Sequence, residues 1–173
     1  MVVGLGNPGH EYEWTRHNIG AHVVEELGKK HNLVFRAERG VEALMARGMI
    51  GEQPVVLACP QTFMNESGRS VNRLLRFVGA TVHELLVVID DIETPWKSVK
   101  TAVSGGTRGH NGLRSLQALL GSMEFAQLRF GVGRPGGGNV ADYVLHRFSA
   151  EEMAELPALL TSAVVLIEEW VRG

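Results

Sequence analysis

The sequence contains few features that would cross-link the chain or insert it into a membrane. Cys59 is the only cysteine among 173 residues, which excludes an intrachain disulfide and is typical of a reducing compartment. No apolar run approaches the roughly 20 residues that a transmembrane helix needs, and no signal-peptide pattern follows Met1. We therefore expect a cytoplasmic protein without a membrane partner. A mitochondrial location stays open if an N-terminal segment is missing.

The sequence also lacks the common short motifs of nucleotide and metal enzymes. It has no G-x-S-x-G elbow, no G-x-x-x-x-G-K-[ST] phosphate loop and no H-E-x-x-H zinc motif. Pro60 follows Cys59, and no signature of a cysteine nucleophile surrounds the pair. We expect neither a metal nor a cofactor.

One nucleotide motif is present, because Gly4–Gly9 reads G-x-G-x-x-G. A dinucleotide site also needs a helix that starts at the last glycine and an acid about 20 residues later. Here the predicted helix begins only near Ile19, and Lys29 and Lys30 occupy the acid position. The glycines are better explained by a tight turn at a strand end that presents Asn7. A nicotinamide oxidoreductase remains a rival hypothesis, which NAD binding would test.

Short apolar runs alternate with helical patterns along the chain, whose 173 residues and 45% hydrophobic content fit one domain, residues 1–173. This alternation predicts an α/β domain with a largely parallel, twisted sheet. Central strands are expected at Val2–Leu5 and Leu85–Ile89, and weaker ones at Val41–Met49, Val55–Ala58, Val99–Val103 and Leu128–Val132. Helices are expected after Asn18, Ser67 and Asn111, and from the capping box of Ser149 and Glu152, with a kink or restart at Pro157 and a mobile loop at Arg134–Gly138.

Polar side chains follow several of these strands or precede the helices. They are Asn7, His17, Asn65, Asp90, His110 and Asn111. In an open α/β sheet such residues gather at the carboxyl edge, where ligands bind. An asparagine before a helix is by itself usually an N-cap, so the set carries more weight than any member.

Positive charge is concentrated in one part of the chain. Residues 97–147 hold seven Lys or Arg against two Asp or Glu, whereas the whole chain has a net charge of −2. Such a basic segment suits a phosphate backbone, although charged runs are often simply solvated surface.

Five blocks of the sequence carry a family resemblance: GLGNPGHEYEWTRHNIG, TFMNESGRSV, VVIDDIETP, RGHNGLRSL and LRFGVGRP. In this order and spacing the chain resembles the bacterial-type peptidyl-tRNA hydrolases from Val2 to about Trp170. The resemblance implies an enzyme that hydrolyses the ester between a peptide and the terminal ribose of tRNA and so recycles tRNA from abandoned translation. It also implies a mixed, mostly parallel sheet flanked by helices, no cofactor, and a monomer that acts on the acceptor end of peptidyl-tRNA.

The resemblance also implies roles for individual residues. The catalytic set is the base His17, the orienting carboxylate Asp90, and Asn7. The substrate-binding set is Tyr12, Met64, Asn65, His110 and Asn111. The basic residues expected to bind tRNA phosphates are Lys97, Lys100, Arg108, Arg114, Arg129 and Arg134.

The chemistry of these residue types agrees with such roles. Histidine has a pKa near neutrality, and a carboxylate on its far ring nitrogen fixes the tautomer. The start of a helix near His17 opposes the carboxylate, so we expect a base near its working range. Side chains alternate along a strand, so only one of Asp90 and Asp91 can meet His17, and the resemblance selects Asp90. With no activated serine or thiol in the set, direct attack by water is preferred.

The chain departs from the family pattern at Trp96–Lys97, where a glycine is common, at Ala102, where some members have a lysine, and at Thr107–Arg108. A non-catalytic RNA-binding relative of the same fold stays open as an alternative, which a turnover assay would test.

Overall fold

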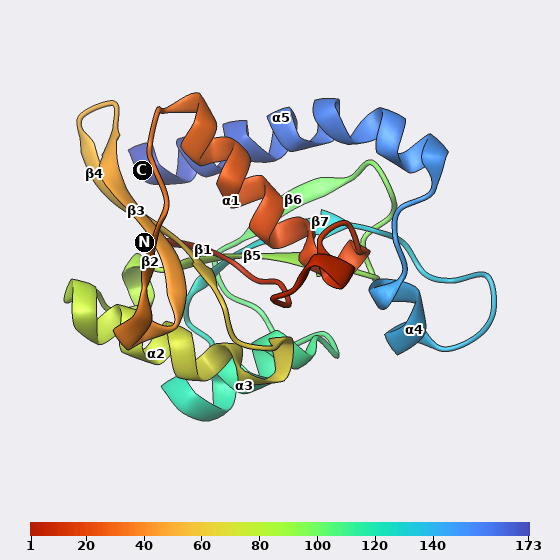
Figure 1. Ribbon diagram of the computed structural model, residues 1–173, viewed down its shortest axis with the longest axis horizontal. Helices are drawn as coiled ribbons and strands as arrows, with labels where there is room; N and C mark the ends of the chain where they lie inside the picture. Colours follow the sequence, from red (N-terminus) through yellow and green to blue (C-terminus); the bar gives the residue numbers. More distant parts are fainter.

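A computed structural model describes residues 1–173 as one seven-stranded sheet with helices on both faces (Figure 1). The strand order across the sheet is β2-β3-β4-β1-β5-β7-β6. The strands are β1 (Val2–Gly4), β2 (Arg36–Glu38), β3 (Ala43–Ile50), β4 (Gln53–Pro60), β5 (Leu86–Asp91), β6 (Val99–Ala102) and β7 (Ala126–Gly131). The α-helices are α1 (Ile19–Lys30), α2 (Ser67–Val78), α3 (Asn111–Leu120), α4 (Val140–Leu145) and α5 (Ala150–Arg172).

The centre of the sheet is parallel, and its margins are antiparallel. Strands β4, β1, β5 and β7 pair in parallel, whereas β3 and β6 run against their neighbours. The run Leu86–Ile89 in β5 is buried on both faces, as expected for a strand between two helical layers. The predicted α/β class with a mixed, mostly parallel sheet is confirmed.

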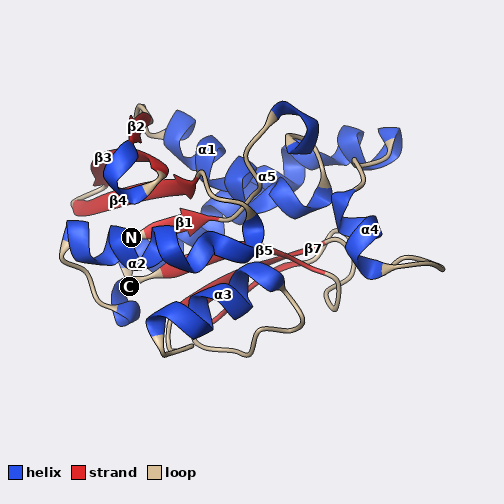
Figure 2. Cartoon of the chain, turned by 60° about the horizontal axis from the view of Figure 1, so that its bottom comes forward, coloured by secondary structure: helices blue, strands red, loops and turns tan.

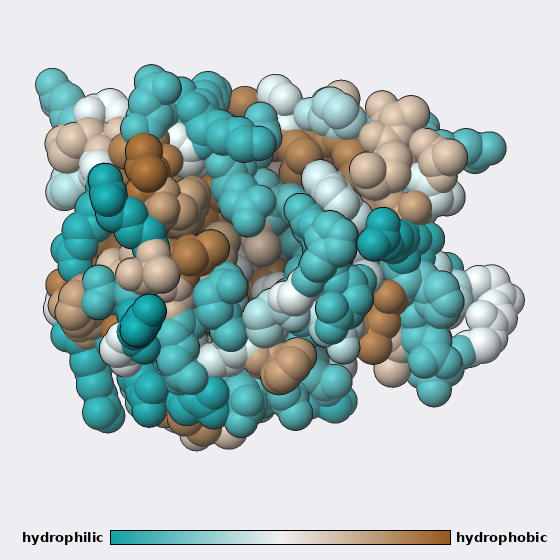
Figure 3. Space-filling view, viewed as in Figure 1, coloured by the Kyte–Doolittle hydropathy of each residue, from teal (hydrophilic) through white to brown (hydrophobic).

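Two helical layers cover the sheet. Helices α1 and α5 pack on one face and α2 and α3 on the other, and each layer closes its own apolar core (Figures 1 and 2). Hydrophilic residues cover most of the face seen in Figure 3, where apolar side chains form small separate patches. No helix of the structure is long and apolar enough to cross a membrane.

Glycines let α1 lie directly on the sheet. A Cβ at Gly4 would overlap the carbonyl of Gly20, and a Cβ at Gly20 would overlap the carbonyl of Val88. Gly9 adopts a φ of 108°, which favours glycine in the turn after β1. The G-x-G-x-x-G pattern thus serves helix–strand packing as well as the expected turn.

Some expected elements differ from the structure. The strand expected from Val41 begins at Ala43, because residues 39–41 form a 3₁₀ turn and Glu42 has a left-handed φ of 52°. The short elements β2 and α4 were not predicted. A helix restart at Pro157 is wrong, since α5 runs unbroken through it.

Candidate active site

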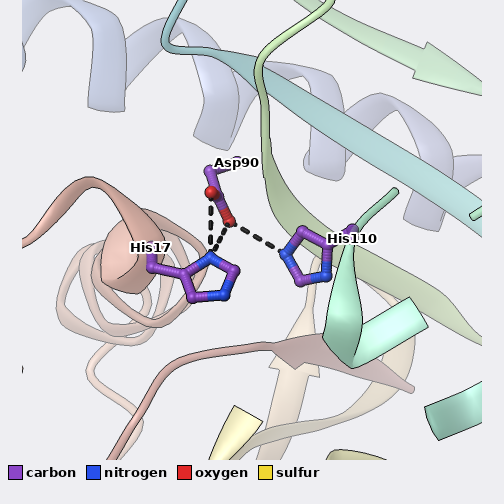
Figure 4. A group of neighbouring side chains, drawn as sticks. All are labelled: His17, Asp90 and His110. Carbon is purple, nitrogen blue, oxygen red and sulfur yellow. Dashed lines mark hydrogen bonds and ion pairs between the residues drawn. The ribbon is translucent and has the colours of Figure 1, made fainter. Parts of the chain in front are cut away.

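The carboxylate of Asp90 lies between two histidine rings at the end of β5 (Figure 4). His17 comes from the 3₁₀ turn before α1, and its Nδ1 lies 2.9 Å from Asp90 Oδ2. His110 comes from the start of α3, and its Nε2 lies 2.9 Å from Asp90 Oδ1. All three residues are buried. The structure therefore brings together three residues separated by up to 93 positions in the sequence.

The backbone of α3 fixes the tautomer of His110. The Nδ1 atom accepts hydrogen bonds from the backbone N–H of Gly112 (3.0 Å) and of Leu113 (3.3 Å). It therefore carries no proton, and Nε2 must be the N–H that donates to Asp90. His110 is thus the N-cap of α3 and supports the carboxylate through Nε2–H, and it has no free nitrogen for proton transfer.

Charge and burial act in opposite directions on the pKa values of the pair. Burial alone would raise the pKa of Asp90, but the two histidines hold it well below its usual range. Burial alone would lower the pKa of His17, but the charge and the hydrogen bond of Asp90 raise it above 6.5. The influence of Asp90 therefore prevails. His17 Nδ1–H donates to Asp90, which leaves Nε2 as the free basic atom.

The amide of Asn7 is oriented by two neighbours. Its Oδ1 accepts the backbone N–H of Met64 at 2.7 Å, so its NH₂ group remains as a free donor. The side chain of Asn18 holds the backbone of Asn7 through two hydrogen bonds, of 2.8 and 2.9 Å. Asn18 directly precedes α1, and its side chain makes no capping bond to that helix. Its positioning role left no signal in the sequence beyond its place beside His17.

Two cavities open from His17. The small cavity has a volume of about 280 Å³ and the large cavity one of about 520 Å³. Both are bordered by His17, Asn111, Ala141 and Val144. The large cavity is further lined by Asn7, Tyr12, Phe63, Met64, Asn65 and Leu145, and the small one by Asp90, Asp91, Arg108, His110 and Arg114 among others. Every residue predicted for catalysis or substrate binding thus lies at one of the two cavities.

The helix α4 forms a wall shared by both cavities, and sequence reasoning missed it. Arg16 ties this wall to the His17 segment by donating to the carbonyl of Tyr143 (3.1 Å) and to Glu152 (2.8 Å). Asn139 caps α4 by accepting the N–H of Ala141. The glycine-rich stretch before it masked this short helix in the sequence.

The basic residues predicted to bind tRNA divide into three groups. Arg108 and Arg114 line the small cavity. A second group lies on the surface outside both cavities and consists of Lys97, Lys100 and Arg134. Lys100 is exposed on β6, whereas Lys97 pairs with Glu155 and Arg134 pairs with Glu93.

Arg129 is the third group and is mostly covered, which does not favour the expected phosphate contact. It is 9% exposed on β7, donates to Gln127 Oε1 at 3.1 Å, and is covered by the backbone at Gly105. It lies opposite Lys100 in the pairing of β6 with β7, so its cover comes from the segment at Gly105 and not from the strand register.

His17, Asp90 and His110 also form a group that could hold a metal ion, because each offers one ligand atom and these atoms lie within 4.8 Å of one another. A metal on His110 Nε2 would move the ring proton to Nδ1, where it would face the N–H groups of Gly112 and Leu113. The arrangement therefore suits hydrogen bonds and proton transfer better than metal binding.

Comparison with known proteins gives a consistent result. The family model described as peptidyl-tRNA hydrolase matches residues 1–173. The chain is 46% identical to a peptidyl-tRNA hydrolase of Geobacter metallireducens over 173 residues, covering 100% of this chain and 89% of that protein. It is 42% identical to one of Syntrophomonas wolfei, covering 100% and 93%. The crystal structure of peptidyl-tRNA hydrolase from Acinetobacter baumannii matches with a TM-score of 0.88 and 32% identity, covering 99% of this chain and 85% of that one.

Proposed function

The chain belongs to the peptidyl-tRNA hydrolase family, and from this premise we propose that His17, oriented by Asp90, is the base that activates water against the ester of peptidyl-tRNA. Hydrolysis of the ester between peptide and tRNA is the activity that the family and the relatives share, so a non-catalytic RNA-binding role is not favoured. The observation that carries the assignment is that His17 lines both cavities while its Nδ1 is held by Asp90, which leaves its Nε2 without a protein partner.

The reaction needs one proton acceptor that later becomes a donor. Water attacks the ester carbonyl carbon and gives its proton to His17 Nε2, and the imidazolium is stabilised by the ionised Asp90. The tetrahedral intermediate then breaks the bond to the ribose oxygen, which takes the proton from Nε2. The products are the peptide carboxylic acid and tRNA with a free terminal hydroxyl. The site contains no activated serine or thiol, because the one cysteine, Cys59, is buried and its pKa is raised by burial.

Asn7 is suited to stabilise the charge that forms on the carbonyl oxygen. Its Oδ1 is occupied by Met64, so the group that it offers to the large cavity is an N–H donor. A fixed donor aimed at a developing oxyanion needs no rearrangement during the reaction. Asn18 supports this role by holding the backbone of Asn7.

The two cavities suit the two parts of the substrate. The large cavity combines the amide of Asn65 with the apolar side chains of Phe63 and Met64, which fits a peptide of variable sequence. The small cavity contains Arg108 and Arg114, which fits the acceptor end of tRNA. One chain supplies every group that the reaction needs, so a monomer suffices. The single buried cysteine fits the reducing compartment that we propose, the cytoplasm.

The test of this assignment is His17→Ala, with His83→Ala as the matched control because His83 is exposed and remote from both cavities. Release of an N-blocked aminoacyl group from tRNA is measured, beside the unblocked aminoacyl-tRNA. We expect kcat to fall by about 10²-fold or more, the contribution of a positioned base. Turnover by His17→Ala close to that of His83→Ala, with both variants folded, would remove His17 from the mechanism.

A further inference from the structure

The second acid of the pair at the end of β5 has contacts of its own. Asp91 is 3% exposed and makes no contact with His17, which pairs with Asp90 alone, in agreement with the alternation of strand side chains. It accepts hydrogen bonds from Thr94 Oγ1 (2.6 Å) and from the backbone N–H of Glu93 (3.0 Å). Its third partner is Arg108, whose Nε lies 3.2 Å from Asp91 Oδ2. The carboxylate is therefore fixed on one side by the chain after β5 and faces Arg108 on the other.

The pairing leaves most of the Arg108 guanidinium available. Arg108 donates to Asp91 only through Nε–H, and neither of its terminal NH₂ groups bonds to the protein. The side chain is 29% exposed and lines the small cavity with His17 and Arg114. Two parallel NH₂ groups are the part of arginine that matches two oxygens of a phosphate.

The backbone of Arg108 is also held in an uncommon conformation. Its φ is 50°, and Gly109 follows with a φ of 77°, immediately before His110. A side chain other than glycine persists in the left-handed region only where its surroundings hold it there. The contact with buried Asp91 is such a restraint, because it fixes the direction in which Arg108 leaves the loop.

We propose that Asp91 is a positioning residue for substrate affinity, which holds Arg108 so that its two NH₂ groups bind a phosphate of the RNA end in the small cavity. The two adjacent acids then have separate roles, since Asp90 supports proton transfer and Asp91 supports binding of the substrate phosphate. This inference rests on the proposed function, and it concerns KM, whereas the role of His17 concerns kcat.

The competing explanation is that Asp91 only neutralises Arg108. The two explanations predict opposite signs for Asp91→Asn. A lost restraint weakens phosphate binding and raises KM for peptidyl-tRNA. A lost counter-charge strengthens the attraction of Arg108 for phosphate and lowers KM.

The experiment compares Asp91→Asn, Arg108→Ala and the double variant, with Arg76→Ala as the control because Arg76 is an exposed arginine outside both cavities. We expect Arg108→Ala to raise KM by about tenfold with kcat within about threefold, and to reduce the slope of log(kcat/KM) against log[salt] by about 1. Asp91→Asn is expected to raise KM severalfold. In the Arg108→Ala background it should add nothing, because residues that act as one unit are not additive.

Three results would overturn the proposal. A lower KM for Asp91→Asn would make Asp91 a counter-charge. If Asp91→Asn raised KM equally in the wild-type and the Arg108→Ala backgrounds, Asp91 would act through its turn with Thr94 and not through Arg108. An unchanged KM for Arg108→Ala would remove the phosphate contact. None of these results bears on His17→Ala, so failure here is distinguishable from failure of the proposed function.

Discussion

Replacing Asp90 by asparagine changes the central contact of the site with little change of shape. The carboxylate accepts hydrogen bonds from both histidines, whereas a carboxamide has one acceptor oxygen and one NH₂ donor. The tautomer of His110 is fixed by the backbone of α3, so the carboxamide oxygen must face His110. The NH₂ group then faces His17 Nδ1. The ring proton of His17 moves to Nε2, the atom that must accept a proton from water.

The expected loss is large because the base is placed in the wrong tautomer. Comparable replacements of a carboxylate beside a catalytic histidine reduce kcat by about 10⁴-fold. The pKa of His17 also changes, in a direction that the structure determines. Burial lowers this pKa and Asp90 raises it above 6.5, so removal of the charge leaves only the lowering effect. The acid limb of the pH profile should therefore move to lower pH in the variant.

The measurement is kcat and kcat/KM for release of an N-blocked aminoacyl group from tRNA, from acid to alkaline pH. Glu52→Gln is the control, since Glu52 is an exposed acid in the turn between β3 and β4. Thermal unfolding of each variant establishes that the fold is intact. The reasoning is refuted if folded Asp90→Asn keeps turnover within about tenfold of the control, or if its acid limb moves to higher pH.

Three further predictions concern stability and substrate binding. Gly20→Ala should lower Tm by several degrees because its Cβ would overlap the carbonyl of Val88, whereas Gly40→Ala, which has open space, should not. Glu168→Gln should lower the free energy of unfolding by about 2 kcal/mol, since Glu168 accepts hydrogen bonds from Lys30 Nζ and His31 Nε2, each at 2.8 Å. Burial raises the pKa of Glu168, but these two bonds lower it below 4.5. The contribution of Glu168 to stability is therefore complete above that pH and is lost in acid. Denaturant titration should show that the wild-type protein and Glu168→Gln have the same free energy of unfolding at low pH. Lys100→Glu should raise KM and flatten the salt dependence of kcat/KM, and an unchanged salt slope would argue against a phosphate contact.

The sequence predicted those strands and helices whose buried apolar residues recur at a regular spacing. Leu86–Ile89 is fully buried in β5, and its unbroken apolar run predicted a central strand. The apolar positions of α1, α2 and α3 predicted these helices in the same way. The elements that were missed have no such repeat, because β2 has three residues at the sheet margin and α4 has six residues after a glycine-rich loop. Their structure depends on tertiary contacts that a local pattern does not record.

The candidate site was predictable for residues whose place follows from strand ends. His17 and Asp90 come together because β1 and β5 end at the same edge of the sheet. The positioning contacts were not predictable, since the bonds of Asn18 to the backbone of Asn7 depend on how two loops meet. The burial of Arg129 was missed because its charge suggested surface, whereas Gln127 and the loop segment at Gly105 cover it.

The arrangement around Asp90 limits the site to one proton that can move. His110 cannot gain a proton at Nδ1 without losing two backbone hydrogen bonds, and its Nε2–H already donates to Asp90. Asp90 stays ionised near neutral pH, because both histidines hold its pKa well below the usual range against the effect of burial. In the proposed mechanism, His17 is therefore the one member of the group that changes charge. The second histidine beside the carboxylate holds Asp90 without competing with His17 for the proton, so the two imidazoles of this site are compatible with a single general base.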